Sequence, residues 1–370
     1  MTSKLLLAIA TTITTTYAIA PIALHFTVPA SSNSENLIRL RSYDSDGSET
    51  SSSITSLSGC QSNNCGTLNQ LSQPYSSYGY EPKSGNLITG QSTPITITGS
   101  ANRFVYTPPN NKKQPEDRWG WLEWQAYDGT SYSTKPGIIA LLAPGNILVR
   151  SSFTFDTEAW AITSNGAGGV GTSHSASSRG LLNHYITSKD DEINISPSSG
   201  DDTRLWYFVA PSKFLASSTT NPTNLLAFGG SLQFTMSSQA GDFSVTNLNS
   251  NVPLVVMECA TCGNGMGIRL VRTLGENGLV FDGKEKVFNI PFTTSSTMAS
   301  NGIVWKKDSR STLIDFTETN DCELIEVLNG LSSLKILGDF TKWHESVSLD
   351  DVKMVAGHPV TIPLSCYPIG

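Results

Sequence analysis

The chain has 370 residues and a formal net charge of −7, and 15% of its residues are charged. At about 150 residues per domain, this length suggests two or three domains, each able to bury a hydrophobic core. The negative charge argues against binding to nucleic acid, which needs a basic surface, and against an anionic membrane surface. Since charges fall well below the usual ~25%, the surface must be rich in small polar residues, as in secreted β-proteins.

The N-terminus predicts a signal peptide over residues 1–20. Lys4 is followed by a short apolar run, and small residues stand at 18–20, which is the order of regions in a secretory signal. Pro21 disfavours cleavage after residue 20, so cleavage after Ala18 is an alternative. Neither this run nor any later segment reaches the ~20 apolar residues of a membrane span. The sequence therefore predicts a secreted, extracellular protein with no membrane span.

Residues 24–143 are expected to form a first all-β domain. Short alternating runs at 95–98, 103–106 and 138–142 predict strands. Early in this half, the turn Asp44-Ser45-Asp46-Gly47 can present two carboxylates to a hard cation. It lacks the length and the terminal Glu of an EF-hand loop. A solvated turn closed by Asp and Gly is the alternative interpretation.

The order of motifs in this half resembles cadherin-like, Ig-type repeats. The motifs are the acidic turn at 44–47, ITSL at 54–57, GTL at 66–68, VYTP at 105–108 and AYDG at 126–129. The resemblance implies a calcium ion near Asp44 and Asp46, with Asp128 as a third ligand. Ser48 stands where a further Asp is usual in such repeats, which is a departure from the pattern.

Three tryptophans lie close together near the end of this half. On a regular strand, Trp119 and Trp121 would share one face and Trp124 would point to the other. We interpret them as core residues and a covering layer at the domain junction. The alternative is an exposed aromatic platform that stacks on sugars.

Residues 147–370 are expected to form a second all-β domain, with the boundary near 143–146. Strands are predicted at 205–209, 232–236 and 346–349, and turns at points such as Gly229-Gly230. Helical periodicity is limited to about ten residues after Cys322.

The motifs of this half resemble the laminin B domain (laminin IV type A). They are FTFD at 153–156 before Trp160, WYFVAPSKFL at 206–215, FGGSLQF at 228–234, IEVL at 325–328 and LDDV at 349–352. The resemblance implies a galactose-binding-like jelly roll of the kind found in matrix glycoproteins. Many jelly rolls of this shape hold a structural calcium ion, and by that analogy Asp156, Glu158 and Asp351 are candidate ligands. Departures from the family pattern are the altered turn after Leu215, Ala159 before Trp160 and the added cysteine clusters.

Six cysteines in short clusters suit an oxidising compartment. We predict three disulfides, namely Cys60–Cys65, Cys259–Cys262 and Cys322–Cys366. A zinc site would need a second CxxC or paired His. A redox CxxC would open a helix, whereas Cys259 follows an apolar run and Cys262 precedes a Gly-rich turn.

Other motifs carry little chemistry. The GxGxxG match at 166–171 is followed by a poor helix former, so a dinucleotide site is not expected. No nucleophile elbow is complete, no His lies in a metal pattern, and the adjacent acidic pairs at 190–191 and 201–202 point apart on a loop. The sequon at Asn194 predicts N-glycosylation, which Pro197 after it disfavours.

The sequence therefore predicts an all-β chain, with an Ig/cadherin-like β-sandwich followed by a galactose-binding-like jelly-roll β-sandwich. We expect a non-enzymatic structural or adhesion protein of the extracellular matrix or cell surface, stabilised by disulfides and structural Ca²⁺. Its expected partners are matrix proteins or glycans. The alternatives are a carbohydrate-binding module that uses the jelly roll, and an accessory domain of an extracellular hydrolase.

Overall fold

The computed structural model describes part of the 370-residue chain. The described residues are 20–30, 35–44, 50–58, 66–71, 84–87, 95–98, 102–109, 118–143, 145–163, 171–190, 205–216, 223–241, 243, 252–275, 279–294, 305–308, 316–341, 344–357 and 362–367. At 55–58, 84–87, 118, 190 and 316 the description covers the backbone alone. The expected signal peptide, Asp46, the Cys60–Cys65 pair and Asn194 lie outside these residues.

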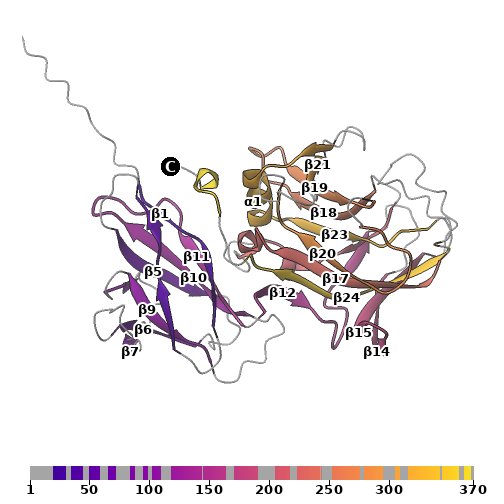
Figure 1. Cartoon of the computed structure of the whole chain (residues 1–370), viewed down its shortest axis with the longest axis horizontal. Helices are drawn as coiled ribbons and strands as arrows, with labels where there is room; N and C mark the ends of the chain where they lie inside the picture. The colour runs from indigo at the N-terminus through magenta and orange to yellow at the C-terminus, as the bar shows by residue number, and fades with distance from the viewer. Residues whose placement is uncertain are drawn as a thin grey trace, which may run out of the picture.

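The N-terminal half of the described chain forms two main sheets (Figure 1). A five-stranded sheet has the order β2 (Phe26–Pro29), β11 (Gly137–Leu142), β10 (Arg118–Tyr127), β5 (Ser51–Ser58) and β8 (Ile95–Thr96). A four-stranded sheet has the order β3 (Asn36–Arg39), β9 (Arg103–Thr107), β6 (Thr67–Leu71) and β7 (Ser84–Leu87). A short ladder joins β1 (Ile22–Ala23) to β4 (Ser42–Tyr43). The pair β2–β11 is parallel.

Side chains from both of these sheets meet in one hydrophobic core. Phe104 and Tyr106 of β9 are fully buried, and they share one face because successive side chains of a strand point to opposite faces. They belong to the same cluster as Leu122 and Trp124 of β10. Because two sheets enclose one core, this half is a β-sandwich.

The three tryptophans of β10 are all buried, which confirms that they do not form an exposed platform. Trp119 and Trp124 both pack in the N-terminal core. Their indole N–H groups donate to the carbonyls of Ala30 (2.8 Å) and Leu24 (3.2 Å). The prediction that these two point to opposite faces is wrong, because the register of β10 shifts between Arg118 and Gly120. Such a shift reverses the alternation that a regular strand would keep.

The C-terminal half forms two larger antiparallel sheets (Figure 1). One has the order β14 (Ser173–Arg179), β15 (Leu182–Asp190), β24 (Glu345–Val355), β17 (Ser231–Ala240) and β20 (Lys286–Pro291), with β12 (Ile147–Ser151) also paired to β24. The other has the order β13 (Ala161–Thr163), β16 (Tyr207–Val209), β23 (Ser333–Leu337), β18 (Pro253–Cys259), β19 (Ile268–Thr273), β21 (Lys306–Asp308) and β22 (Phe316–Glu318).

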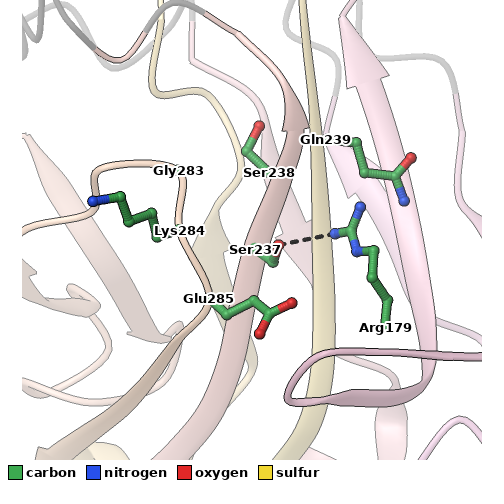
Figure 2. A pocket seen from close by; sticks show the side chains of 7 residues that line it. All are labelled: Arg179, Ser237, Ser238, Gln239, Gly283, Lys284 and Glu285. Carbon is green, nitrogen blue, oxygen red and sulfur yellow. Dashed lines mark hydrogen bonds between the residues drawn. The ribbon is translucent and has the colours of Figure 1, made fainter.

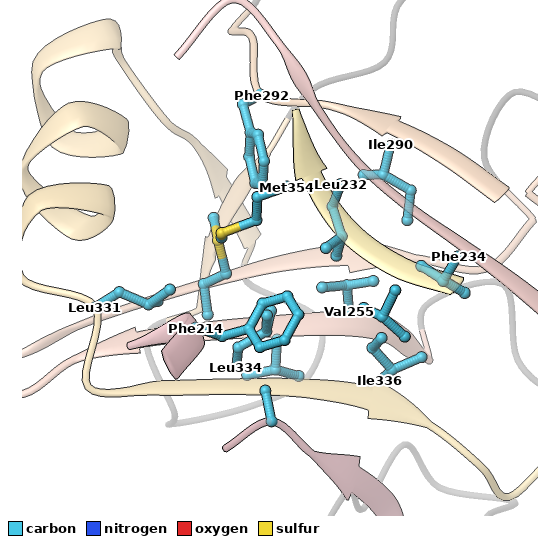
Figure 3. Close-up of a cluster of buried hydrophobic side chains, with 14 of the residues drawn as sticks. Phe214, Leu232, Phe234, Val255, Ile290, Phe292, Leu331, Leu334, Ile336 and Met354 are labelled. Carbon is cyan, nitrogen blue, oxygen red and sulfur yellow. The ribbon is translucent and has the colours of Figure 1, made fainter. Parts of the chain in front are cut away.

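The core of this half lies between its two sheets (Figure 3). Leu232 and Phe234 of β17 are buried from one side, and Leu334 and Ile336 of β23 from the other. Phe214, in the single turn η3 (Ser212–Phe214), is also buried there. This half is therefore a second β-sandwich.

One α-helix, α1 (Asp321–Asn329), accompanies these sheets. Asn320 and Glu323 form a capping box, which satisfies backbone N–H groups at the start of the helix. Its buried residues follow helical spacing; they are Leu324, Ile325, Val327 and Leu328. They pack near η4 (Asn224–Ala227) and β18, so the helical periodicity seen after Cys322 is confirmed.

Strand β11 contributes to both cores. Its six residues, Gly137–Leu142, are all buried. Ile139 and Leu141 belong to the N-terminal cluster, whereas Ile138 and Leu142 belong to the C-terminal cluster. A strand buried on both faces reads as a continuous apolar run, as this one does.

These observations confirm the predicted fold class. The described chain is mostly β, with two successive β-sandwiches and one short helix. The strands predicted at 103–106, 138–142, 232–236 and 346–349 lie within strands of the structure, whereas those predicted at 95–98 and 205–209 are strands only at 95–96 and 207–209. Among the described residues, no helix has the length and apolar character needed to cross a membrane.

Candidate functional site

An open groove lies on the outer face of the six-stranded sheet (Figure 2). Its volume is about 890 Å³. Its lining comes from the end of β14, from β17 and from the loop before β20; the residues are Arg179, Ser237, Ser238, Gln239, Gly283, Lys284 and Glu285. Polar and charged side chains therefore dominate this surface.

The groove exists because the tip of the β14–β15 hairpin lies over the sheet. Arg179 Nη2 donates to Ser237 Oγ (2.9 Å) on β17 and to Ser348 Oγ (3.4 Å) on β24. Thr187 Oγ1 contacts the same Ser348 hydroxyl at 2.8 Å. Ser237 and Ser348 are buried, and buried hydroxyls need such partners. The guanidinium of Arg179 thus gives the hydroxyl groups of Ser237 and Ser348 the hydrogen bonds that water would give them on an open surface.

Glu285 fixes the hairpin turn from the opposite side of the groove. Its Oε2 accepts the backbone N–H of Leu181 at 2.9 Å. The preceding Gly180 has φ +54°, and a Cβ there would collide with the Glu285 carboxylate. Glycine is needed for both the left-handed backbone and the close approach. Figure 2 shows Arg179 and Glu285 on either side of Ser237.

Tyr185 lies under the edge of the groove. The Arg179 guanidinium lies 5.4 Å from the centroid of its ring, and Gln239 Nε2 donates to its hydroxyl at 3.4 Å. A hydrogen bond from Ser175 is the largest influence on the pKa of Tyr185 and lowers it, burial opposes this, and Arg179 and Gln239 add to the lowering. These contacts hold Gln239, an exposed side chain, at the mouth of the groove.

A buried carboxyl group lies beside this surface, in the long strand β24. Asp350 accepts the N–H groups of Asn183 and Asp351, each at 2.6 Å. Burial raises its pKa to about 6, and these two hydrogen bonds work against that rise. Both carboxyl oxygens are thus used in joining the start of β15 to β24, which makes Asp350 a structural group.

The groove offers hydrogen-bond donors and acceptors side by side. Arg179 and Lys284 donate, Glu285 accepts, and Gln239 can do both. Sugar hydroxyl groups, which donate and accept together, match such a surface. Aromatic stacking does not contribute, because the nearby Tyr185 is only 6% exposed.

The calcium ligands expected in the N-terminal half lie only partly within the described residues. Asp44 directly follows β4, and Asp46 lies outside the described residues. Asp128 closes its own turn, because Oδ1 accepts the N–H groups of Thr130 (2.6 Å) and Ser131 (2.7 Å). This is the geometry of a turn closed by an Asp side chain.

The calcium ligands expected in the C-terminal half have other partners. Asp351 pairs with Arg150 (2.7 Å) and Lys353 (2.7 Å). Glu158 pairs with Lys213, and Asp156 Oδ1 accepts the Glu158 N–H at 2.6 Å. In this arrangement each of these carboxylates already has a partner within the chain.

In the part of the chain that the structure describes, no three His, Cys, Asp or Glu side chains gather as metal ligands do. Calcium binding by the whole chain stays a prediction.

Two predicted disulfides form. Cys259 bonds to Cys262, and Cys322 of α1 bonds to Cys366 in the turn η6 (Leu364–Cys366). Cys60–Cys65 and glycosylation at Asn194 stay predictions, because these residues lie outside the described chain. Most of the Gly-rich loop at 166–171 also lies outside it.

The sequence did not single out the groove residues. Arg179, Gln239 and Glu285 belong to no motif, because a surface assembled from two strands and a loop leaves no local spacing. A weak signal exists in β17, where Thr235, Ser237 and Gln239 alternate with the buried Phe234 and Met236. That pattern predicts a polar outer face, although it does not predict a groove.

A comparison with known protein families finds a match for part of the chain. Residues 207–363 match the Laminin B (Domain IV) family. This is the region of the predicted WYF, FGG and LDDV motifs, so the resemblance to laminin B domains is confirmed there. No curated protein matches the chain.

Two solved structures are similar to parts of the chain at low identity. The L4b domain of human laminin alpha-2 is 13% identical with a TM-score of 0.36, and the match covers 56% of this chain and 98% of that chain. The BSP domain of a biofilm associated protein is 9% identical with a TM-score of 0.19, covering 90% and 50%. The cadherin-like resemblance of residues 24–143 stays a prediction.

Proposed function

We propose that this chain is a non-enzymatic structural or adhesion module that works outside the cell. The observation that carries the proposal is the match of residues 207–363 to the Laminin B (Domain IV) family. Two disulfides in the described chain support an oxidising compartment. Strand β11, buried in both cores, supports a rigid arrangement suited to a spacer.

The proposal assigns no catalytic role to Asp350. A catalytic carboxyl group with a perturbed pKa must face its substrate. Asp350 has such a pKa, but it is only 4% exposed and holds two backbone N–H groups. Its carboxyl group therefore serves the fold by accepting these two backbone N–H groups.

Solid-phase binding tests this function. The disulfide-intact chain is titrated onto immobilised laminin, collagen and fibronectin, and the reduced and alkylated chain is the control. Saturable binding to one of them that the control lacks is the expected result. An intact, folded chain that binds none of the three contradicts the adhesion role.

Carbohydrate binding is a second candidate function. The observation that favours it is the polar groove between Arg179 and Glu285, where guanidinium, amide and carboxylate groups lie within one surface. Such groups bind the hydroxyls of a neutral saccharide in pairs, one accepting and one donating.

A glycan panel, probed with added Ca²⁺ and again with chelator, tests this candidate. Gln239→Ala removes an exposed amide of the groove, and Gln233→Ala, on the same strand, is the matched control. We expect Gln239→Ala to weaken binding about fivefold, since a lost hydrogen bond costs ~1 kcal/mol. Equal binding by both variants would remove the groove from the explanation, and loss of binding on chelation would support the predicted calcium ion.

A further inference from the structure

Phe155 stands at the tip of a loop that follows β12, and it is 89% exposed. The two ends of this loop are firmly held, because Phe153 and Trp160 are buried and their rings meet edge to face at 6.1 Å. A fully exposed phenyl ring gains nothing from the fold of its own chain. The ring is therefore available for a contact outside that chain.

The backbone of this loop is strained. Phe153, Glu158 and Ala159 have φ values of +50°, +48° and +61°, a region that residues with a side chain adopt only at a cost in free energy. Strain of this kind persists at functional sites, where the surrounding structure enforces it.

Polar contacts enforce the strained shape. Glu158 Oε1 accepts the N–H groups of Ser152 (3.0 Å) and Phe153 (2.6 Å), and its Oε2 pairs with Lys213. His174 Nε2 contacts the Phe153 carbonyl at 2.7 Å. The loop thus presents Phe155 as a preorganised anchor, and preorganisation lowers the entropic cost of binding.

The same chain carries a receptor for such an anchor. A cleft of about 660 Å³ lies between the two halves, next to the Cys322–Cys366 disulfide. Its apolar lining includes Pro136, Ile138, Leu225, Ile325 and Ile362. The volume falls in the range of pockets that enclose small organic molecules, so a phenyl ring fits within it.

The cleft is lined by one lysine, Lys135, and by two carboxylates, Glu123 and Glu326; of these three, only Lys135 can pair with a carboxylate beside the anchor. Lys135 is exposed at the cleft and pairs with no carboxylate of the described residues. Asp156 is exposed next to Phe155, and its one contact in the described chain is the Glu158 N–H. An incoming Phe155-Asp156 pair would place its carboxylate near this ammonium group.

We propose that the chain associates with a second copy of itself, Phe155 of one copy entering the cleft of the next, with Asp156 facing Lys135. The contact goes beyond the proposed function, because it needs no other matrix component. Anchor and cleft are different surfaces, so the contact is heterologous and joins copies head to tail.

Sedimentation velocity of the full, disulfide-intact chain tests the proposal over about 1–100 μM, a range suited to a weak contact of small area. The sedimentation coefficient of the wild type is expected to rise with concentration. Phe155→Ala should abolish the rise, and Ser365→Trp, which fills the cleft from an exposed position, should abolish it too. Met266→Ala, at another highly exposed apolar residue, is the control and should leave the rise unchanged.

Mixing the two inactive variants distinguishes this contact from a symmetric one. Phe155→Ala protein keeps an open cleft and Ser365→Trp protein keeps the anchor, so their mixture should form a complex that neither forms alone. A wild type that stays monomeric, a rise that survives Phe155→Ala, or a mixture of folded variants that forms no complex would each overturn the proposal. Thermal unfolding of every variant verifies that it is folded.

Discussion

The imidazole of His25 stacks on the phenol ring of Tyr367, with centroids 5.2 Å apart and ring planes 9° from parallel. The backbone N–H of His25 donates to Tyr367 Oη at 3.1 Å, and His25 Nδ1 accepts the N–H of Ile138 at 3.0 Å. His25, near the start of the described chain, and Tyr367, at its end, thus contact each other beside β11.

Acid should weaken this contact through His25. Burial, and to a smaller extent Lys135, lower the pKa of His25 from 6.5 to about 4. The unfolded chain then binds a proton that the folded chain does not, so stability is lost as the pH falls from 6.5 to 4. The loss should approach about 3 kcal/mol, since one pKa unit corresponds to ~1.4 kcal/mol.

Denaturant unfolding of wild type and His25→Asn at several pH values measures this loss. Asn keeps an acceptor near the position of Nδ1 but does not titrate, so the variant should lack this part of the pH dependence. His344→Asn, at an exposed histidine, serves as control. Equal pH dependence in wild type and His25→Asn would show that His25 is protonated when folded.

The Cys322–Cys366 disulfide should contribute more stability than Cys259–Cys262. The first closes a separation of 44 residues and the second a separation of 3. Loop-closure entropy then gives about 4 kcal/mol for the first and about 1.5 kcal/mol for the second. Unfolding of the two double-Ser variants compares them, and limited proteolysis should cut near Tyr367 sooner in Cys322→Ser/Cys366→Ser. A larger loss in the CxxC variant would refute the entropic ranking.

Asp350 should oppose His25 in the pH dependence of stability. Its pKa is raised to about 6, first by burial, so the folded chain binds a proton more tightly than the unfolded chain. Stability therefore rises as the pH falls through 6 toward 4. Asp350→Asn should remove this rise, which is read from unfolding midpoints at pH 7 and pH 4. A variant whose midpoints keep the wild-type difference would contradict the assignment.

Glu158→Gln should loosen the loop that carries Phe155. The substitution removes the charge that pairs with Lys213 and weakens the acceptor for two backbone N–H groups. Hydrogen bonds to charged groups are worth ~1.5–3 kcal/mol, so a loss of about 2 kcal/mol is expected in thermal or denaturant unfolding. Asp282→Asn breaks the exposed pair with Lys284 and should change stability by less than ~0.5 kcal/mol.

Patterns that are local in the sequence predicted the structure well. The alternation in β9 and β17 and the helical spacing of Leu324 to Leu328 each reflect which side chains face a core. The family motif around Trp206 works in the same way, since this side chain is fully buried. Buried positions recur at the regular spacing of a strand or a helix, so they can be recognised from the order of apolar residues in the sequence.

Features that depend on contacts between distant segments could not be predicted from the sequence. The bulge near Gly120 reversed the expected direction of Trp124, because one extra residue changes every later position. Glu158 and Asp351 were predicted as calcium ligands, whereas their contacts with Lys213 of η3 and Arg150 of β12, which are distant in the sequence, could not be predicted. The position of Arg179 in the groove depends on the path of the β14–β15 hairpin over the sheet, and no spacing of residues in the sequence predicts that path.

The parallel pairing of β2 with β11 has a mechanical consequence. Residues 26–29 of β2 pair with residues 139–142 of β11, and β11 continues directly toward β12 and the second sandwich. A pull that separates the start of β2 from the second sandwich would draw the two strands past each other along their length. Their hydrogen bonds would then bear the load together and would not open one after another, so this short ladder would act as the part of the first sandwich that resists stretching.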